Sequence, residues 1–334
     1  MPGQIDNYMT SDPPQIAVHI VTHNNTGTIK SCLDALQAQT IGFDVCIVDN
    51  ASHDGTVERI RALGYPVIEN TVNTGYSAAH NQAIRCTENP YILTLNPDVR
   101  LMPDFLEQML ASFEANPNVG AQAGLLLRVN SLDENPICVD SCGLTMQANH
   151  RQKLRYEGCA VEDVPQTPEM IFGPDGAAAM YRRTMLKGIA TDGEIFDEDF
   201  FLQKEDIDLC WRIIYAGWDA LFVPAARAHH IRGFRPGQRK PVDRMTRQYA
   251  VRNRYLLLMK HYRTTLFLRQ IIPLLAYDLA ILIYLILFEQ SSLGALWDAL
   301  RLSRRMFYKR RIIREKQLVP DTALLRWFRH SNPC

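Results

Sequence analysis

The densest cluster of acidic side chains in this 334-residue sequence is Glu205-Asp206-Ile207-Asp208, which closely follows the aromatic pair Phe200-Phe201. Apolar residues then recur at helical spacing, so the cluster is expected to open a helix. The helix macrodipole favours carboxylates in a first turn, and this is the structural explanation for them. Three carboxylates within four positions are more than the dipole requires. We therefore predict a functional role, because a carboxylate can act as a general base toward a substrate hydroxyl.

Three further groups of polar residues each follow a short apolar run that is typical of a buried strand. They are Thr22-His23-Asn24 after 16–21, Asp49-Asn50 after 43–48, and Asn96-Pro97-Asp98 after 91–95. In open α/β sheets, ligands bind beyond the carboxyl ends of the strands, so these groups are candidates for a binding site. Helix N-capping is the alternative, and it explains Ser52 and Asp54. It does not explain Asp98, because the next helix begins only at Pro103-Asp104.

The elements that would position these residues alternate between strand and helix through the first 116 residues. Strands are expected at 16–21, 43–48, 66–69 and 91–95, and helices at 26–39, 56–63 and 76–85. This alternation predicts a doubly wound, mostly parallel α/β sheet flanked by helices. Beyond Asn116 the alternation loosens. Strands expected at 119–129, 137–146 and 176–181 predict a mixed second half.

Neither a GxGxxG pattern nor a GxxxxGK[ST] pattern occurs in the sequence. Glycine-rich binding of a dinucleotide or of ATP phosphates is therefore not expected. If a nucleotide binds at the strand ends, another group must neutralise its diphosphate. A divalent cation, Mg²⁺ or Mn²⁺, held by a carboxylate can do so, because these ions take few protein oxygens and bridge phosphates.

Taken together, six segments resemble the family-2 glycosyltransferases with a GT-A fold, and among them the rhamnosyltransferase-like branch. The segments are Val21-Thr22-His23-Asn24, Asp49-Asn50-Ala51-Ser52 with Asp54-Gly55-Thr56, Asn73-Thr74-Gly75-Tyr76 with Asn81, Leu95-Asn96-Pro97-Asp98-Val99, Glu205-Asp206-Ile207-Asp208-Leu209-Cys210-Trp211-Arg212, and Val223-Pro224 leading to His230. Each segment is a weak signal alone, but together they cover residues 16–232 in the family's order. The resemblance implies an inverting transfer of a sugar, with rhamnose favoured, from a dTDP- or UDP-linked donor. The acceptor would be a hydroxyl of a lipid-linked molecule or a polysaccharide in cell-surface glycan synthesis.

The resemblance also implies which residues bind the donor. Thr22 and Asn24 would line the nucleotide pocket, and Asp49 would hydrogen-bond the base or the ribose. Asn73 and Gly75 would shape the loop beside the diphosphate.

The residues expected at the metal occupy the place of the family's DXD motif, which reads Asn96-Pro97-Asp98 here. Because Asn96 stands at the first acidic position, Asp98 alone is left to hold the cation. His230 matches the family's histidine near the metal and the diphosphate, and His229 is the alternative. A half-buried strand histidine is the structural explanation for His230.

The expected general base is Asp206, with Glu205 as the reserve candidate, while Asp208 would orient neighbours such as Arg212. The acceptor hydroxyl loses its proton as it attacks the anomeric carbon, so a carboxylate must lie within hydrogen-bond reach. The leaving nucleoside diphosphate gains negative charge, which a cation and nearby donors stabilise.

Acidic and basic residues are unevenly distributed along the chain, although the net charge is zero. Residues 1–226 hold 14 Lys+Arg against 30 Asp+Glu, and residues 227–334 hold 22 against 6. We expect a flexible leader at 1–15 and a catalytic domain at 16–235, with a nucleotide-binding half at 16–130 and an acceptor-binding half at 131–235. Residues 236–334 would form a helical, basic region drawn to anionic surfaces.

Residues 271–288 form an 18-residue apolar run that contains Pro273 and Asp278. Its length just reaches the lower limit for spanning a bilayer, but an aspartate near its centre would be costly in hydrocarbon. The eight Lys/Arg of 301–316 would also lie on the wrong side after a single crossing. An in-plane helix on an anionic membrane surface avoids both problems. The alternative is that 271–288 packs on the catalytic domain or on a partner subunit, and a homo-oligomer is compatible with the sequence.

No basic segment followed by an apolar one opens the chain, so we expect no secretory signal and a peripheral location on the cytoplasmic side of the plasma membrane. The eight cysteines include no CxxC pair, so a structural zinc site is not expected. Nucleic acid is not an expected partner, because no recognised binding module accompanies the basic tail. Two other functions stay open: a nucleotidyltransferase that makes a nucleotide sugar, and a non-catalytic glycan-binding protein at the membrane.

Overall fold

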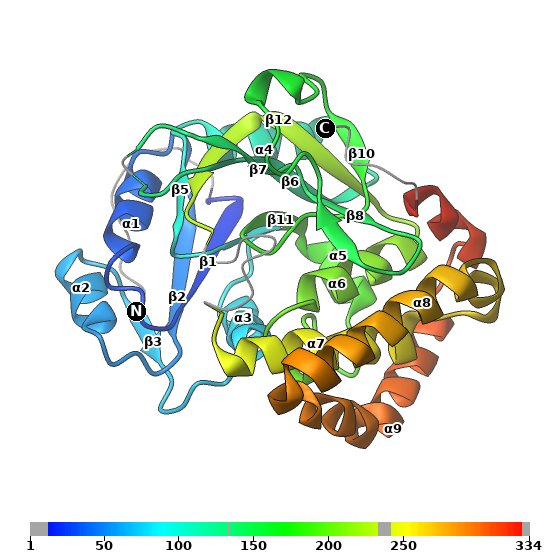
Figure 1. Ribbon diagram of the computed structural model, residues 1–334. Helices are drawn as coiled ribbons and strands as arrows, with labels where there is room; N and C mark the ends of the chain where they lie inside the picture. Colours follow the sequence, from blue (N-terminus) through cyan, green and yellow to red (C-terminus); the bar gives the residue numbers. More distant parts are fainter. Residues whose placement is uncertain (1–12, 133, 233–241, 329–334) are drawn as a thin grey trace.

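A mixed β-sheet with helices on both faces forms the centre of the protein in the computed structural model, which describes residues 13–132, 134–232 and 242–328 (Figure 1). The sheet order is β10-β12-β6-β11-β4-β1-β2-β3. Strands β3, β2, β1 and β4 are parallel neighbours, as the alternating sequence predicts. Strand β11 is antiparallel to both β4 and β6, which makes the second half mixed. The strand bounds are β1 (Ile16–Thr22), β2 (Asp44–Asp49), β3 (Val67–Glu69), β4 (Tyr91–Leu95), β6 (Val119–Arg128), β10 (Glu169–Ile171), β11 (Ala178–Arg182) and β12 (Asp219–His230).

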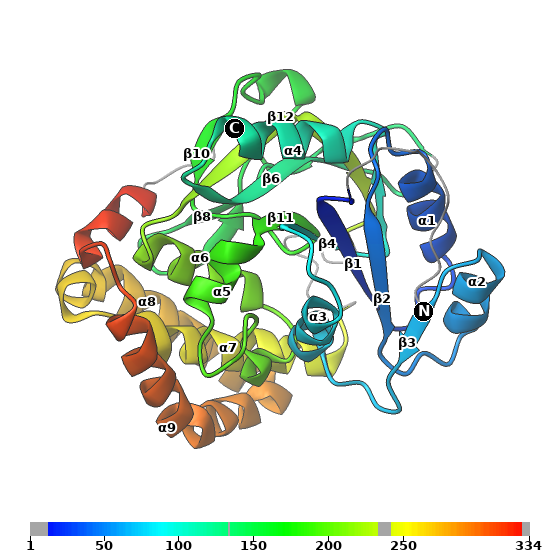
Figure 2. The same ribbon diagram turned by 180° about the vertical axis from the view of Figure 1, so that it is seen from behind.

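Two helical layers cover the sheet and explain why its central strands are apolar on both faces. On one face, α1 (Ile29–Gln37), α2 (Thr56–Ala62) and α4 (Phe105–Ala115) contribute to one core cluster. On the other, α3 (Tyr76–Arg85), α5 (Arg183–Ile189) and α6 (Glu205–Tyr215) contribute to a second. Figure 2 shows α4 over the sheet as seen from behind. The expected fold class is therefore confirmed.

The expected strand at 137–146 is wrong as a single element. Cys142 and Gly143 interrupt it, and Gly143 has φ +90°, a conformation that suits glycine. Strand β7 (Cys138–Ser141) pairs with β6, whereas β8 (Leu144–Met146) forms a separate hairpin with β9 (Gln152–Leu154). A short strand that the sequence does not predict, β5 (Val99–Leu101), follows Asp98 and pairs with β12.

The carboxyl-terminal helices are α7 (Arg244–His261), α8 (Thr264–Phe288) and α9 (Gly294–Glu315), and they lie together at one end of the molecule (Figure 1). Leu256 of α7 and Met306 of α9 are buried in one cluster with Phe200. Helices α7 and α9 therefore pack against the region around Phe200. The expected boundary at 235/236 and residues 1–12 of the expected leader lie outside the described residues.

Two buried lysines attach α7 and α9 to residues 194–208. The Lys309 ammonium on α9 contacts Glu194, Asp197 and Asp199 at 2.9, 2.5 and 2.9 Å. The Lys260 ammonium on α7 lies 2.6 Å from both Asp197 and Asp208. Buried charges of this kind are stable only when they are paired, so each lysine depends on its carboxylates and the carboxylates depend on the lysines.

We predict that Lys309→Met lowers the free energy of unfolding by about 3–5 kcal/mol, because it leaves buried carboxylates without their counter-ion. Urea denaturation followed by circular dichroism measures the change. Arg311→Met is the matched control, because Arg311 pairs with Glu315 on the exposed side of the same helix. Its effect should stay below about 1 kcal/mol. Equal losses in the two variants would contradict the structural role of Lys309.

Candidate active site

Asp98 and His230 face one another at the end of the parallel strands, as the sequence predicts. Asp98 lies in the turn between β4 and β5, and His230 ends β12, with His230 Nε2 3.6 Å from Asp98 Oδ1. His230 Nδ1 is 2.8 Å from an oxygen of Asp140, which is completely buried. Among the described residues, the buried Oδ1 of Asp98 accepts no hydrogen bond. His229, the alternative, instead lies 3.3 Å from the Arg100 guanidinium.

The charges around Asp140 set the electrostatics of this group. Burial raises the pKa of Asp140, but the hydrogen bond from His230 and the charge of Arg232 outweigh it and hold that pKa well below its usual range. Burial lowers the pKa of His230, but the hydrogen bond to Asp140 and the charge of Asp98 together raise it to about 9. The imidazole is therefore oriented by a carboxylate on one side and faces a second carboxylate on the other.

This arrangement fits a divalent cation that also binds phosphate. A carboxylate that hydrogen-bonds one nitrogen of a metal-binding histidine orients the ring and makes the other nitrogen a better ligand. A cation between Asp98 and His230 would replace the proton on His230 Nε2. No group of three or more His, Cys, Asp or Glu side chains in the described part of the chain could hold a metal. Two protein ligands suffice for Mg²⁺ or Mn²⁺ when waters and phosphates supply the others.

Glu205 and Asp206 open helix α6, as expected, and they lie in an unusual electrostatic environment. Asp206 Oδ2 accepts from the Gly176 N–H at 3.3 Å, and Oδ1 accepts from the Ile207 N–H at 2.8 Å. Burial, to which nearby Asp175 adds, raises the pKa of Asp206 above that of an ordinary aspartate. Burial and the charge of Asp206 raise the pKa of Glu205. Both carboxylates are thus shifted toward the range in which a general base operates.

Asp208 is different, although it stands only two residues further on. It is completely buried, and it pairs with Arg212, Lys260 and His261. Burial raises the pKa of Asp208, but Arg212 and Lys260 outweigh it and lower that pKa well below its usual value. The expectation that Asp208 orients Arg212 agrees with the 2.9 Å hydrogen bond between them.

The segment 175–177 connects the two carboxylate sites. Its Gly176 N–H contacts Asp206, and its Ala177 carbonyl accepts from the Asn96 N–H at 2.8 Å. Asp175 lies 3.4 Å from the Arg232 guanidinium, which also binds Asp140. Asp206 and Asn96, which stands two residues before Asp98, therefore border the same short stretch of backbone.

Thr22 and Asp49 lie side by side at the ends of β1 and β2. The Thr22 hydroxyl donates to Asp49 at 2.7 Å, and both side chains are buried. Asp49 also accepts from the N–H and the hydroxyl of Ser52, at 2.8 and 2.6 Å. Asn24 is exposed, and its backbone N–H donates to the Ser52 hydroxyl at 2.8 Å. Their contacts with a nucleotide stay predictions, because in this structure Thr22 and Asp49 hold the adjoining loop.

Asn73 and Gly75 shape the loop before α3, and their place beside a diphosphate stays a prediction. The Asn73 side chain accepts from the Gly75 N–H at 2.9 Å, and the Asn50 side chain donates to the Gly75 carbonyl at 3.0 Å. Gly75 has φ +86°, and a Cβ there would lie 2.6 Å from the Phe201 ring. Only glycine fits, because the loop passes directly against the segment that precedes Asp206.

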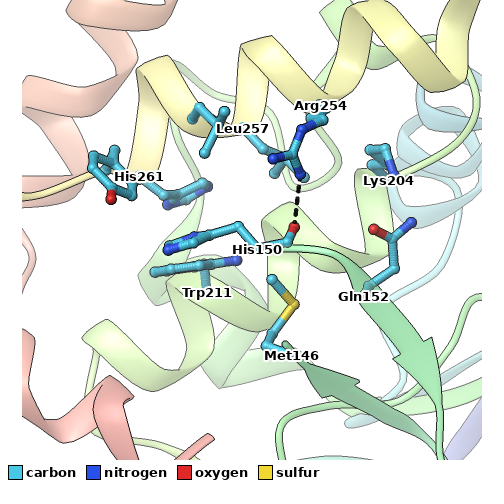
Figure 3. Close-up of a pocket in the computed structure, with 10 residues that line it drawn as sticks. Met146, His150, Gln152, Lys204, Trp211, Arg254, Leu257 and His261 are labelled. Atoms are coloured by element: carbon cyan, nitrogen blue, oxygen red, sulfur yellow. Dashed lines mark hydrogen bonds between the residues drawn. The ribbon is translucent and has the colours of Figure 1, made fainter. Parts of the chain in front are cut away.

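A cavity lies beside the amino terminus of α6, between the β8–β9 hairpin and α7 (Figure 3). The rings of His150 and Trp211 stack at 5.9 Å on its floor. Lys204 and Gln152 lie on one side of it, and His261 on the other (Figure 3). It is lined by Met146, His150, Gln152, Lys204, Trp211, Arg254, Leu257, Leu258, His261 and Tyr262.

Several residues of the site escape prediction from the sequence. Asp140 and Asp175 belong to no recognisable motif, and only the fold brings them beside His230 and Asp206. Asn253, which is completely buried on α7, donates to the carbonyls of Phe200, Leu202 and Gln203 just before Glu205. In the sequence, the only signal for Asn253 is its place between Arg252 and Arg254 in the helical region expected at 236–334.

Three curated relatives of low sequence identity are named glycosyltransferases or rhamnosyltransferases. The chain is 24% identical over 231 residues to rhamnosyltransferase WbbL of Escherichia coli, covering 64% of this chain and 83% of that one. It is also 24% identical over 215 residues to an N-acetylglucosaminyl-diphospho-decaprenol L-rhamnosyltransferase of Mycobacterium tuberculosis, covering 58% and 68%. An uncharacterised glycosyltransferase of Haemophilus influenzae is 29% identical over 106 residues, or 31% of this chain and 36% of that one. The chain thus spans about a third of the Haemophilus protein.

Solved structures agree on the fold. Residues 1–349 of Staphylococcus aureus TarS match with a TM-score of 0.53 at 16% identity, covering 92% of this chain and 93% of that one. The mannosyltransferase PcManGT of Pyrobaculum calidifontis, solved in complex with GDP-Man and Mn²⁺, matches with a TM-score of 0.51 at 17% identity, covering 92% and 86%. The family model for glycosyl transferase family 2 matches residues 17–189, more than half of the sequence. The chain belongs to glycosyl transferase family 2.

Proposed function

We propose that this protein is an inverting glycosyltransferase that moves a sugar from a nucleotide diphosphate to a hydroxyl of a lipid-linked or polysaccharide acceptor. The observation that carries the proposal is the pair of carboxylate sites on either side of 175–177. Asp98 with His230 suits a diphosphate and its cation, and Asp206 suits a proton acceptor. Rhamnose is the proposed sugar, because two relatives of the chain are named rhamnosyltransferases.

Asp206 would take the proton of the acceptor hydroxyl while the hydroxyl oxygen bonds to the anomeric carbon. The bond between that carbon and the diphosphate oxygen breaks in the same displacement, so the anomeric centre inverts and the nucleoside diphosphate leaves with the electron pair. Glu205 is the reserve base, and burial together with the charge of Asp206 raises its pKa.

Asp98 and His230 would hold the divalent cation, and Asp140 keeps the imidazole ring in place. When bound, the cation supplies positive charge to the leaving diphosphate. Asn73, Gly75, Thr22, Asn24 and Asp49 would position the nucleotide next to it. We propose Mn²⁺ or Mg²⁺ because the metal ligands present here are the Asp98 carboxylate and the His230 imidazole. PcManGT was solved with Mn²⁺ and GDP-Man.

The exposed face of α8 supports binding to a membrane surface. The apolar segment Leu268–Phe288 is long enough to cross a bilayer, and only 11% of it is buried in the structure. Its Asp278 pairs with Arg254 of α7 at 2.7 Å, so the charged group lies on the side that packs on the protein. Ile272 and Leu287 are 79% and 64% exposed. We propose that α8 lies in the plane of the membrane on its cytoplasmic side, with the basic residues of α9 near anionic lipid.

The two other candidate functions have less support. A nucleotidyltransferase would need positive charge after β1 to hold a triphosphate, and residues 21–27 contain no Lys or Arg. A glycan-binding protein would not need a carboxylate with a raised pKa beside a second carboxylate site. Ligand-induced stabilisation by dTDP or UDP with Mn²⁺ separates a transferase from a scaffold.

We predict that Asp206→Asn lowers turnover by about 100-fold or more while donor binding changes by less than about threefold, because the amide keeps the shape but takes no proton. Incubating the purified protein with a panel of nucleotide sugars and measuring slow donor hydrolysis identifies the donor. The rate of sugar transfer and the affinity for the donor are then compared between the wild type and Asp206→Asn. Glu205→Gln is the matched variant and should lose less turnover. An unchanged rate in Asp206→Asn would overturn the assignment of the base.

We predict that kcat falls as the pH is lowered through a value above the ordinary range of a carboxylate. The base must be ionised to accept a proton, and burial with Asp175 nearby raises the pKa of Asp206. Activity should therefore be complete above the raised pKa and lost below it. A pH–rate profile from pH 4 to 8, with intact folding checked at each pH, measures the midpoint. A midpoint near 4 would contradict the environment described for Asp206.

We predict that Ile272→Glu combined with Leu279→Glu weakens binding to vesicles containing phosphatidylglycerol by at least about tenfold, because two apolar side chains no longer enter the membrane. Co-sedimentation measures it. Ile137→Glu, also at an exposed apolar residue but away from α8, is the control and should bind like the wild type. Point variants are preferable to deletion of 266–334, which would also remove Lys309. Equal binding by all three proteins would exclude α8 as the membrane contact.

A further inference from the structure

Two hydrogen bonds hold Gly176, and one of them is made with the proposed base. The Gly176 N–H donates to Asp206 Oδ2 at 3.3 Å, and the Gly176 carbonyl accepts from the Tyr76 hydroxyl at 2.8 Å. Burial, to which the charges of Glu205 and Asp206 add, raises the pKa of Tyr76, so its hydroxyl stays protonated and acts as the donor. Helix α3, which begins at Tyr76, therefore holds the residue that binds Asp206.

The close approach of the hydroxyl depends on the glycine. A Cβ at position 176 would lie 3.3 Å from the Tyr76 oxygen, closer than an ordinary van der Waals contact. Without a side chain, Gly176 also has more backbone freedom than any other residue. The orientation of the peptide groups on either side of it therefore depends on their hydrogen bonds, and the Tyr76 hydroxyl supplies one of them.

The ring of Tyr76 is itself held in place. It packs against the His80 ring, with the centroids 4.2 Å apart, and edge-on against the Phe196 ring at 6.2 Å. Both neighbours are buried. The Asn81 side chain fixes Phe196, because it accepts from the Phe196 N–H at 2.9 Å and donates to the Phe196 carbonyl at 2.7 Å. The direction of the Tyr76 hydroxyl is therefore set by the packing around it.

The first turn of α3 also holds the segment before α6. The Ser77 N–H donates to the Phe201 carbonyl at 3.2 Å, and Gly75 lies directly against the Phe201 ring. The turn thus contacts both the residue that binds Asp206 and the segment that leads into α6. In the proposed function, the loop before this turn lies beside the donor diphosphate. Helix α3 therefore connects the donor loop with the base.

We propose that Tyr76 is a positioning residue for the base: its hydroxyl fixes Gly176, so that the Gly176 N–H stays directed at Asp206 Oδ2. The inference rests on the proposed function for the role of Asp206. Each carboxylate oxygen can accept more than one hydrogen bond, so Asp206 is oriented by this contact and can still bind the acceptor hydroxyl. Tyr76 acts through Gly176 and takes no proton itself.

The contact also affects the proton affinity of the base. Burial and the charge of Asp175 raise the pKa of Asp206, and the N–H groups of Ile207 and Gly176 lower it. Weakening the Gly176 contact should therefore raise that pKa further, because the ionised carboxylate loses a donor. The titratable groups around Asp206 are Lys204, Glu205 and Cys210 in or beside α6, Asp175 in the neighbouring segment, Tyr76 on α3 and Tyr181 on β11.

Tyr76→Phe tests the proposal, because it removes only the hydroxyl. The kcat should fall about tenfold, and the midpoint of the pH–rate profile should move up by about half a unit or more. Titration calorimetry should show a change of less than about twofold in the affinity for dTDP with Mn²⁺. An unchanged kcat and midpoint would overturn the proposal. A loss of dTDP affinity as large as the loss of kcat would also overturn it, because Tyr76 would then act on the donor.

Tyr181→Phe is the matched control. The Tyr181 hydroxyl is buried and has no hydrogen-bond partner among the described residues, so its loss should change neither kcat nor the midpoint. Equal effects in the two tyrosine variants would overturn the proposal, because the cause would then be general packing around Asp206.

Gly176→Ala tests the same contact from the other side. Its Cβ would crowd the Tyr76 oxygen, so this variant should resemble Tyr76→Phe. When the oxygen is absent, the added methyl group should cost little, and the two losses of kcat should therefore not add in the double variant. Additive losses would mean that the residues act independently, which contradicts the proposal.

An NMR titration of the Asp206 carboxyl, assigned with Asp206→Asn, requires no sugar transfer. The titration midpoint should rise in Tyr76→Phe and stay unchanged in Tyr181→Phe. An unchanged midpoint in both variants would overturn the positioning role. Failure of the proposed function is seen separately, as absence of donor hydrolysis by the wild type or as an unchanged transfer rate in Asp206→Asn.

Discussion

The position of helix α6 depends on the buried pairing between carboxylates in residues 194–208 and amines of the carboxyl-terminal helices. Asp197 lies between Lys260 and Lys309, and Asp208 lies between Arg212 and Lys260. These contacts surround the first turn of α6, which carries Asp206. Because an unpaired charge in this interior would cost several kcal/mol, α7 and α9 must be in place before α6 can present its carboxylates. The region that the sequence marks as a basic tail is therefore part of the structure that positions Asp206.

One helical turn contains carboxylates with opposite environments. Asp208 is surrounded by cations and stays ionised, whereas burial and neighbouring negative charge favour the protonated forms of Glu205 and Asp206. Divergent environments of this kind assign different roles to chemically identical groups. Asp208 holds the helix, and Asp206 is free to exchange a proton. The structural explanation therefore holds for Asp208, and the functional explanation is proposed for Asp206.

Sequence periodicity predicts the first half of the fold well. The expected helix at 76–85 has the bounds of α3, and four expected strands became the parallel part of the sheet. Local patterns suffice there, because the apolar residues within each strand or helix indicate which of its faces is buried. They fail for long-range pairs: Lys309 reads as one of eight basic residues in 301–316, and nothing local shows that its ammonium is buried. Asp140, which binds His230, and Asn253, which binds the segment before α6, could not be predicted for the same reason: each contact joins residues that are far apart in the sequence.

The ion pair between Arg254 and Asp278 has a geometric consequence for the substrate. Packed helices lie about 8–10 Å apart. Helix α7 contacts α8 through Arg254 and the segment before α6 through Asn253. In the proposed orientation, with α8 in the membrane surface, α7 would set the distance between the bilayer and Asp206. A hydroxyl close to its lipid anchor can reach Asp206, while the far end of a long, extended glycan would have to fold back toward the bilayer. This proposed orientation would therefore favour the first additions to a growing chain over the last.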